Sequence, residues 1–311
     1  MEVILGVDVS SQVLDACLLV GEQALSKSFP YTTIGCRRLL RWAAEQGATQ
    51  GVLEATGGYE QRISRLMVEA GLQVHVVNPA QVRHFARGLG KQAKTDKIDA
   101  QVIARFAQVV PLPPSVSASP TQMELKQLIL RRIELKKMLR AEKNRTRFAI
   151  GVALESIRST MLFLTTQVQF IDHQINSLRL KDQSIAKQTD LLCQQKGVGA
   201  LTAMSLIGLI PELGRIDRRK ISALVGLAPF SRDSGKFKGK RFISGGRAEA
   251  RHALYMPAWV ATQYDTDFKT FYQRLIDRGK KPKVAITAVM RKLLVRLNAM
   301  MRNYLIPLQT P

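Results

Sequence analysis

The feature that most constrains the fold is a regular alternation of short apolar runs and helical segments in the N-terminal third of the chain. Strands are expected at residues 2–9, 13–20, 26–31, 51–54 and 73–78, and helices at 34–45, at 60–70 and from Pro79 onward. Strands that alternate with helices indicate an α/β layer architecture. Three hairpin-like strands followed by two strand–helix units match the order of an RNase H-like domain.

Two of the expected strands end at an acidic residue. Asp8 follows the apolar run of the first strand, and Glu54 follows Gly51-Val-Leu. Ligands of open α/β sheets bind at the carboxyl ends of strands, so both side chains can converge on one site. A charge at the edge of a core is seldom left unpaired. The alternative is two solvated acids at strand edges.

A second pair of acids lies at the start of a helical segment. Asp96 and Asp99 occur in Lys-Thr-Asp-Lys-Ile-Asp-Ala, ahead of apolar residues at helical spacing. Positions three apart share a face of a helix, so both carboxylates can point at one spot. Mg²⁺ is usually held by one or two carboxylates together with substrate phosphate. The alternative is a helix start whose acids suit the helix dipole.

Taken together, the four acids predict a metal site. Asp8 and Glu54 come from strand ends, and Asp96 and Asp99 come from one helix face. Such a quartet could hold two Mg²⁺ ions. A pair of metal ions clamps the attacking and leaving oxygens of a phosphoryl transfer.

The charge balance of the chain indicates a polyanionic partner. Lys and Arg outnumber Asp and Glu 47 to 24, which gives a formal charge of +23 and a pI near 10.4. Nucleic acid is the first partner to consider for such an excess. A membrane surface is the alternative. The sequence shows no long uncharged apolar run and no signal peptide pattern, so we expect a cytoplasmic, nucleoid-associated protein.

Composition changes along the chain predict four regions. Residues 1–110 form the acid-bearing α/β domain, and the Pro/Ser-rich stretch 111–121 is a linker. Residues 122–187 carry apolar stripes typical of two antiparallel helices in a coiled-coil arm. Residues 188–311 form a mainly α domain that opens with Gly-Val-Gly at 197–199. That turn resembles a helix-hairpin-helix, with an ordinary tight turn as the alternative.

The first helix of the expected arm is rich in cations. A surface that faces nucleic-acid phosphates and an ordinary solvated helix face are both compatible with this pattern. The candidate contacts are Arg131, Arg132, Lys136 and Lys137.

A polar, glycine-rich segment at 228–247 carries three serines among many cations. Cations around a serine could bind a scissile phosphate and stabilise its developing charge, and nearby Mg²⁺ could activate the hydroxyl. The alternative is a basic surface loop that touches a nucleic-acid backbone. The candidate phosphate contacts are Arg232, Lys236, Lys238, Lys240, Arg241, Arg247 and Arg251.

With these motifs in order, the sequence resembles the bacterial insertion-sequence transposases of the "one-ten" type, which are related to the Piv pilin-gene invertases. The resemblance covers essentially the whole chain. The matching motifs are Gly-Val-Asp8, Leu-Glu54-Ala-Thr-Gly-Gly-Tyr, Val-Val-Asn-Pro79-Ala, Lys-Thr-Asp96-x-x-Asp99-Ala, Gly-Val-Gly199, Gly226-Leu-Ala-Pro229, Asp233-Ser234-Gly235, Ser244-x-Gly246 and Arg251-x-Ala-Leu-Tyr255-Met-Pro.

The resemblance implies a RuvC-like domain with the acid quartet, a coiled-coil arm, and a C-terminal transposase domain whose nucleophile is Ser234. It further implies a recombinase guided by a structured non-coding RNA that pairs with donor DNA and with target DNA. The expected reaction is Mg²⁺-assisted attack of Ser234 on a phosphodiester, with a covalent phosphoserine intermediate. Strand exchange implies a homo-oligomer, either a dimer or a tetramer.

Two other functions fit the residues. A metal-dependent nuclease of the Holliday-junction resolvase type would use the same four acids with water as nucleophile, and would not need Ser234. A non-catalytic protein that binds RNA or DNA would explain the charge but not the four acids.

Overall fold

The structure is a computed structural model, and it describes residues 2–90, 96–112, 119–230 and 241–306, with the side chains of 96–98 also left out. The chain divides into two compact units, Met1–Val116 and Ser117–Pro311. The division falls inside the stretch that the sequence predicts as a linker. The separation of the arm from the C-terminal domain at residue 187 stays a prediction. In the part of the chain that is described, no helix is long and apolar enough to span a bilayer.

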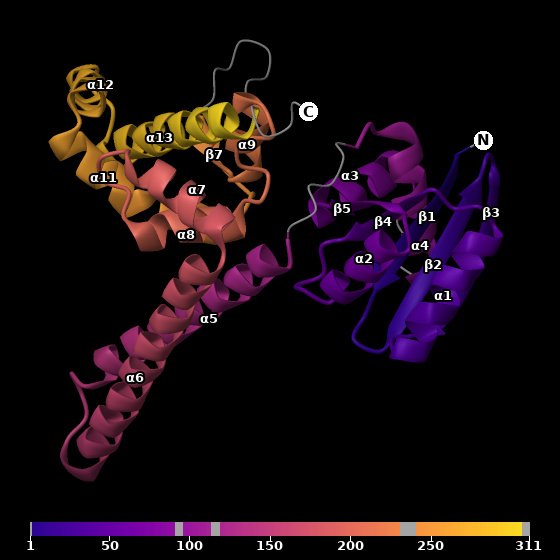
Figure 1. The fold of residues 1–311 in the computed structure, drawn as a ribbon, viewed down its shortest axis with the longest axis horizontal. Helices are drawn as coiled ribbons and strands as arrows, with labels where there is room; N and C mark the ends of the chain where they lie inside the picture. Colours follow the sequence, from indigo (N-terminus) through magenta and orange to yellow (C-terminus); the bar gives the residue numbers. More distant parts are fainter. Residues whose placement is uncertain (1, 91–95, 113–118, 231–240, 307–311) are drawn as a thin grey trace. The chain divides into compact units, whose positions relative to one another are not determined.

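The first unit is built on a five-stranded sheet of order β3-β2-β1-β4-β5 (Figure 1). The pairs β1–β2 and β2–β3 are antiparallel, whereas β4 is parallel to both β1 and β5. This is the RNase H-like topology, and it confirms the predicted fold class. The strands are β1 (Val3–Val9), β2 (Val13–Val20), β3 (Gln23–Pro30), β4 (Gln50–Glu54) and β5 (Gln73–Val77).

Helices cover both faces of the sheet, which explains the near-continuous apolar run of β1. Leu5 and Val7 pack with α1 (Thr33–Glu45) and α2 (Glu60–Glu69) on one face. Ile4 packs on the other face, with α3 (Pro79–Gly88) and α4 (Asp96–Val109). Successive residues of a strand point to opposite faces, so Ile4, Gly6 and Asp8 all point to the side of α4.

Gly6 lets α4 lie directly on β1. A Cβ atom at this position would lie 2.5 Å from the Ala100 carbonyl oxygen and 2.6 Å from the Ala104 nitrogen. Both are backbone atoms, so the helix itself would have to move. The absence of a side chain at Gly6 therefore fixes how closely α4 approaches the sheet.

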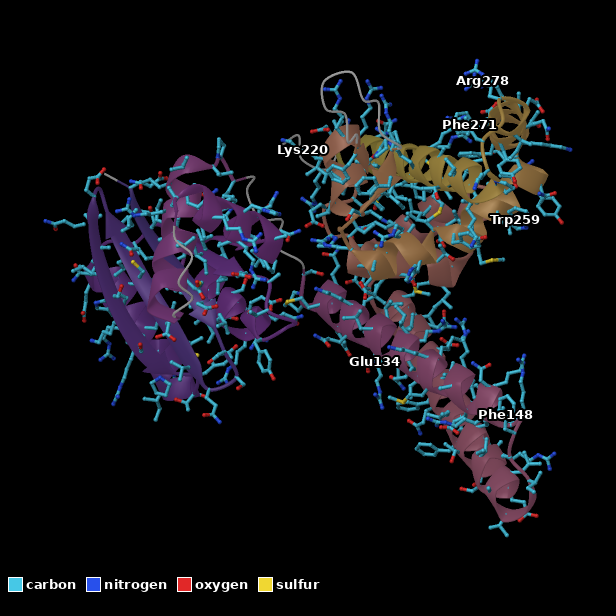
Figure 2. The ribbon with its side chains drawn as sticks, turned by 180° about the vertical axis from the view of Figure 1, so that it is seen from behind. Glu134, Phe148, Lys220, Trp259, Phe271 and Arg278 are labelled. Carbon is cyan, nitrogen blue, oxygen red and sulfur yellow. The ribbon has the colours of Figure 1, made fainter. Side chains whose placement is uncertain are left out.

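The second unit begins with two long helices, α5 (Pro120–Arg145) and α6 (Gly151–Lys181), which form a projecting hairpin (Figure 1). Ser119 caps α5 through a capping box with Gln122. The apolar stripe of α6 faces inward, because Leu164, Val168, Ile171, Ile175 and Leu178 are buried. The distal end packs less tightly: Phe148 is 89% exposed and Ile150 is 85% exposed (Figure 2).

The rest of the second unit is a helical bundle with one short hairpin, and a single apolar core joins it to the base of the arm. Its elements are α7 (Gln183–Cys193), α8 (Ala200–Leu209), α9 (Arg218–Leu224), β6 (Pro229–Phe230), β7 (Phe242–Ile243), α10 (Ala248–Ala253), α11 (Tyr255–Tyr264), α12 (Thr266–Asp277) and α13 (Pro282–Leu305). Trp259 of α11 packs edge-on against Tyr272 of α12, with ring centroids 6.3 Å apart (Figure 2).

The Gly-x-Gly turn joins α7 to α8, as predicted, and its first glycine is needed for packing. Gly197 has φ +93°, and a Cβ there would lie 2.6 Å from the Pro257 carbonyl oxygen of α11. Nothing lies within 4 Å of the corresponding point on Gly199. The close approach of α11 therefore accounts for Gly197 without a bound phosphate.

A polar network ties this turn to the C-terminal helices. The Asp265 carboxylate accepts hydrogen bonds from Gln195 Nε2 and Arg296 Nη1, both at 3.0 Å, and it caps α12 through the Asp267 and Phe268 amides. Burial alone would raise the pKa of Asp265. The hydrogen bond from Gln195, the two amides and the Arg296 charge outweigh burial, so the pKa lies below its usual value.

We predict that replacing Gly6 with alanine destabilises the first unit by about 1–3 kcal/mol, because α4 must shift off β1. Unfolding in urea can be followed through Trp42, which lies in this unit, in a Trp259→Phe background. The control is Gly88→Ala, since nothing lies within 4 Å of a Cβ there. This control should be neutral or stabilising by up to about 1 kcal/mol. Equal stability of the two variants would refute the close approach.

We also predict a pH-dependent contribution from Asp265. Its folded pKa is lowered, so its stabilisation is complete above the unfolded pKa and disappears as the pH falls through the folded pKa. Asp265→Asn keeps an N-cap but loses the carboxylate, and should cost about 2 kcal/mol near neutral pH. The difference from wild type should shrink toward pH 3. Trp259 fluorescence reports this difference, and Asp277→Asn on the same helix is the control for losing a carboxylate away from the network.

Candidate functional site

The strand pairing places Asp8 and Glu54 side by side. Strands β1 and β4 are parallel and in register up to Val7 and Leu53, and each acid is the next residue of its strand. Paired residues of a parallel sheet point to the same face, and neighbouring strands lie about 5 Å apart. Both acids are half-buried. The backbones of the two acids therefore lie side by side, and their convergence on one ligand stays a prediction.

Helix α4 brings the second pair of acids to the same end of the sheet. Ala100 lies over Gly6, which shares a face with Asp8, and the half-buried Asp99 immediately precedes Ala100. Asp96 is the first residue of the helix, with its side chain outside the description. The start of α4 therefore lies over the carboxyl end of β1.

The described side chains do not form a closed metal site. Within the described ranges, no group of three or more His, Cys, Asp or Glu side chains lies close enough to hold a metal ion. The donors nevertheless suit Mg²⁺ in kind, because the quartet consists only of carboxylates and Mg²⁺ prefers oxygen ligands. The backbone gathers the quartet at one sheet edge, and the Mg²⁺ site itself stays a prediction.

A fifth acid, which the sequence analysis missed, lies on the same row of the sheet. Asp15 of β2 is the antiparallel partner of Asp8, and Ser28 of β3 is the partner of Asp15. Asp15 is 9% exposed, and its carboxylate accepts a hydrogen bond from Ser28 Oγ at 2.5 Å. The signal in the sequence was an acid inside the apolar run 13–20. Ser28, Asp15, Asp8 and Glu54 are called the acidic row below.

The turn after Glu54 is held from within. The Glu60 carboxylate, 9% exposed, accepts hydrogen bonds from the Thr56 and Gly58 amides at 3.0 and 2.9 Å. Gly57 and Gly58 have φ of +68° and +111°, which favours glycine at both positions. The Ala55 amide donates to the Val77 carbonyl oxygen of β5 at 3.0 Å. The motif Glu-Ala-Thr-Gly-Gly-Tyr therefore fixes the backbone that leaves Glu54.

Ser234, the predicted nucleophile, lies outside the described residues, but the residues on either side of its segment are described. Strands β6 and β7 form a two-residue antiparallel pair that brackets residues 231–240. Arg241 is exposed next to this pair. The predicted site residues outside the described part of the chain are Ser234, Arg232, Lys236, Lys238 and Lys240.

Two arginines predicted as phosphate contacts are used inside the protein. Arg247 forms a bidentate ion pair with Glu212, in which both N–O distances are 2.6 Å. It also donates a hydrogen bond to the Leu209 carbonyl oxygen. Arg251 Nη1 donates to the Val225 and Gly245 carbonyl oxygens at 3.1 and 2.7 Å. These contacts give both guanidinium groups a structural role, so their role as phosphate contacts stays an untested prediction.

Arg251 stabilises a close backbone contact between Gly226 and residues 245–246, which lie on either side of the segment that contains Ser234 (the serine segment, residues 231–240). Gly226 has φ +72°, and a Cβ there would lie 2.1 Å from the Gly245 oxygen and 2.4 Å from Arg251 Nη1. A Cβ at Gly246 would lie 2.2 Å from the Gly226 nitrogen. The backbone that enters the serine segment therefore contacts the backbone that leaves it.

The arm cations fall into two groups. Arg132 forms an ion pair with Asp172 of α6, and Arg131 forms one with Glu134 of its own helix at 3.2 Å. Lys136 and Lys137 are exposed. Arg132 thus joins the two arm helices, whereas the two lysines are placed where a phosphate backbone could reach them.

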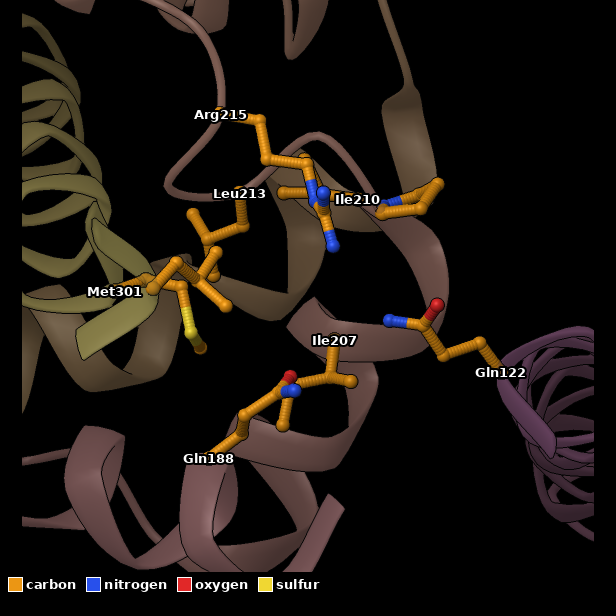
Figure 3. A pocket seen from close by; sticks show the side chains of 9 residues that line it. Gln122, Gln188, Ile207, Ile210, Leu213, Arg215 and Met301 are labelled. Carbon is orange, nitrogen blue, oxygen red and sulfur yellow. The ribbon is translucent and has the colours of Figure 1, made fainter. Parts of the chain in front are cut away.

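A pocket among the described residues of the second unit has a different lining. It is a small hollow of about 20 Å³ within the second unit, where Gln122, Gln188, Ile207 and Arg215 surround the space next to Met301 (Figure 3). None of the predicted catalytic residues lines it. Its volume is below the range of about 300–1,000 Å³ typical of small-molecule sites.

An RNase H-like domain with acids at the carboxyl ends of its strands, joined to a basic helical unit, is an arrangement suited to work on nucleic acids. Family comparison gives the class. A model described as a transposase of the DEDD IS110 kind matches residues 5–150, and a model described as the transposase IS116/IS110/IS902 family matches residues 189–273. Together they cover well over half of the chain. The chain belongs to the IS110 family of transposases, which cut and rejoin DNA.

Individual relatives agree with this assignment. The pilin gene-inverting protein of Moraxella lacunata is 28% identical over 309 residues, which cover 96% of this chain and 95% of that protein. The 42 kDa protein of insertion element IS900 from Mycobacterium paratuberculosis is 35% identical over 124 residues, which cover 38% of this chain and 30% of that protein.

Among solved structures, the T. thermophilus RuvC in complex with Holliday junction substrate matches 37% of this chain and 100% of its own, with 15% identity and a TM-score of 0.29. The RNase H-like class of the first unit rests on its strand order and not on that similarity.

We predict that Arg247→Ala destabilises the second unit by about 3 kcal/mol, since it leaves the poorly exposed Glu212 carboxylate without its partner. Urea unfolding followed through Trp259 measures the change. The control is Arg241→Ala, which removes an exposed cation from the same region and should leave stability within about 0.5 kcal/mol. A stable Arg247→Ala protein with weakened DNA binding would mean that Arg247 acts as a phosphate contact instead.

Proposed function

We propose that this transposase cuts DNA through Ser234, with Asp8, Glu54, Asp96 and Asp99 holding Mg²⁺ at the end of the sheet. The observation that supports the quartet is the register of β1 and β4, which puts Asp8 and Glu54 at neighbouring positions on the face covered by α4. The contacts of Arg251 with Val225 and Gly245 hold the described residues near the segment that contains Ser234, which supports fixed ends for that segment.

The reaction exchanges one phosphoester for another. Ser234 Oγ bonds to phosphorus and loses its proton to solvent, while the bond from phosphorus to one deoxyribose oxygen breaks and that oxygen takes up a proton. The product is a phosphoserine link and a free sugar hydroxyl. In the second half, a hydroxyl of the partner strand attacks the phosphoserine and releases the Ser234 hydroxyl. No external source of energy is needed, because the number of phosphoester bonds is unchanged.

The protein provides the charge and the positions. When bound to the quartet, Mg²⁺ supplies positive charge to the phosphate oxygens during the transfer. The sheet fixes Asp8 and Glu54, and α4 carries Asp96 and Asp99. Cations near the serine, such as Arg241, would neutralise the phosphate before attack.

The partners we propose are donor DNA, target DNA and a structured non-coding guide RNA. A formal charge of +23 and the exposed Lys136 and Lys137 support a large nucleic-acid surface. Exchange between two duplexes requires several cuts, so we propose that a dimer or tetramer is the active form. The exposed apolar side chains at the distal end of the arm are compatible with contacts between copies.

We predict that Ser234→Ala abolishes protein-linked DNA, because no hydroxyl remains to form the phosphoserine. Wild-type protein is incubated with Mg²⁺, labelled DNA from the ends of the element and its target, and RNA transcribed from the element. Denaturing electrophoresis then reveals any covalent link. Ser244→Ala, at the edge of the same segment, should retain the link. Asp8→Asn should lose the link in full-length folded protein.

Three outcomes decide the proposal. A link that requires Ser234, the quartet and the RNA supports it in full. A link that forms equally well without the RNA removes the guide from the proposal but keeps the serine. Cleaved DNA without a link, unaffected by Ser234→Ala, identifies a nuclease that uses water.

A further inference from the structure

We propose that Asp15 is a positioning residue that acts through Asp8 and sets the affinity of this end of the sheet for a divalent cation. The inference deepens the proposed metal site and rests on it. It starts from the acidic row, in which the strand register lines up Ser28, Asp15, Asp8 and Glu54 on the face covered by α4.

The first step is the burial of Asp15. Its carboxylate is 9% exposed, in a strand whose other described side chains are mostly apolar. Among the residues that the structure describes, the hydrogen bond from Ser28 Oγ is its one polar contact. A neutral hydroxyl compensates little of the cost of burying a charge. A cation near the row would add to this compensation.

The second step is the pairing with Asp8. Residues opposite each other in an antiparallel pair have Cβ atoms about 4.5–5.5 Å apart, and like charges in that arrangement destabilise the sheet. Ser28 holds the Asp15 carboxylate on the side of β3. Repulsion between the Asp15 and Asp8 carboxylates therefore adds to the cost of keeping negative charge at Asp8 in the metal-free protein.

The third step links this geometry to metal binding. A divalent cation held by the quartet would relieve the repulsion along the row, so part of the unfavourable energy of the metal-free protein would be recovered on binding. Asp15 adds negative charge one strand away without competing with substrate for the metal. Residues that orient metal ligands in this way typically change affinity by about 10–100-fold when mutated.

The experiment compares full-length wild type with Asp15→Asn by Mn²⁺ and Mg²⁺ titration, using the thermal midpoint of unfolding of the first unit as the readout. Asparagine keeps the size of the side chain and can accept the Ser28 hydrogen bond, but it removes the charge. We expect the metal-free midpoint to stay equal or rise, because the repulsion with Asp8 is gone. We expect the apparent metal affinity to fall about tenfold or more.

Two further variants isolate the cause. Ser28→Ala keeps the Asp15 charge but removes its anchor, and should lower metal affinity by a smaller factor. Glu69→Gln removes one carboxylate from the exposed face of α2 in the same unit and should change nothing. If Asp15→Asn does not fold, Ser28→Ala carries the test alone.

The outcomes separate this inference from the proposed metal site. Wild type that is stabilised by metal, with Asp15→Asn and Ser28→Ala behaving identically to it, overturns the role of Asp15 alone. A less stable metal-free Asp15→Asn with unchanged metal affinity identifies Asp15 as a purely structural residue and also overturns the inference. If metal shifts the thermal midpoint of neither wild type nor Asp8→Asn, the metal site itself is overturned.

Discussion

The in-register pairing of β1 with β4 is the constraint on which the candidate site depends. It places Asp8 beside Glu54, and a slip by one residue would turn one of the two carboxylates to the opposite face of the sheet. The register is secured by the apolar residues that precede the acids, since Leu5, Val7 and Leu53 are fully buried. The hydrophobic layer beneath α1 and α2 therefore determines the arrangement of charges at the end of the sheet. Gly6 then decides how near α4 can bring its own acids.

Some cations of the second unit form contacts within the protein, and others are exposed to solvent. Arg132, Arg247, Arg251 and Arg296 bind carboxylates or backbone oxygens within the unit. These contacts hold the arm together, stabilise the backbone contact at Gly226 and tie α13 to the start of α12. Exposed lysines and Arg241 remain for an external polyanion. Planar guanidinium groups with several donors suit the internal tasks, and flexible lysines suit a phosphate surface. Formal charge alone therefore overstates how many cations are available to nucleic acid.

The sequence predicted the strand and helix order of the first unit well, because apolar runs with acids at their ends are a local pattern. The stripe of α6 was also predictable from its spacing. The position of Asp15 beside Asp8 was not predictable. It depends on the register between β1 and β2, which is a property of the folded sheet. The internal contacts of Arg247 and Arg251 were not predictable, because composition cannot reveal that Glu212 and two backbone carbonyls lie within reach. Ser234 was found through the motif resemblance, and its structural setting lies outside the described residues.

The acidic row is a local cluster of negative charge in a chain whose formal charge is strongly positive. The formal charge of +23 favours encounter with polyanions, whereas the carboxylates at the end of the sheet would repel a phosphate backbone. At short range the sign reverses, because Asp15, Asp8 and Glu54 lie within two strand spacings of one another. If the proposed divalent cation is bound here, its charge would offset this repulsion and would attract phosphate. On the proposed function, close approach of DNA to the row would depend on the metal, whereas encounter through the chain's positive charge would not. That division would let the protein hold nucleic acid without cutting it until the site is complete.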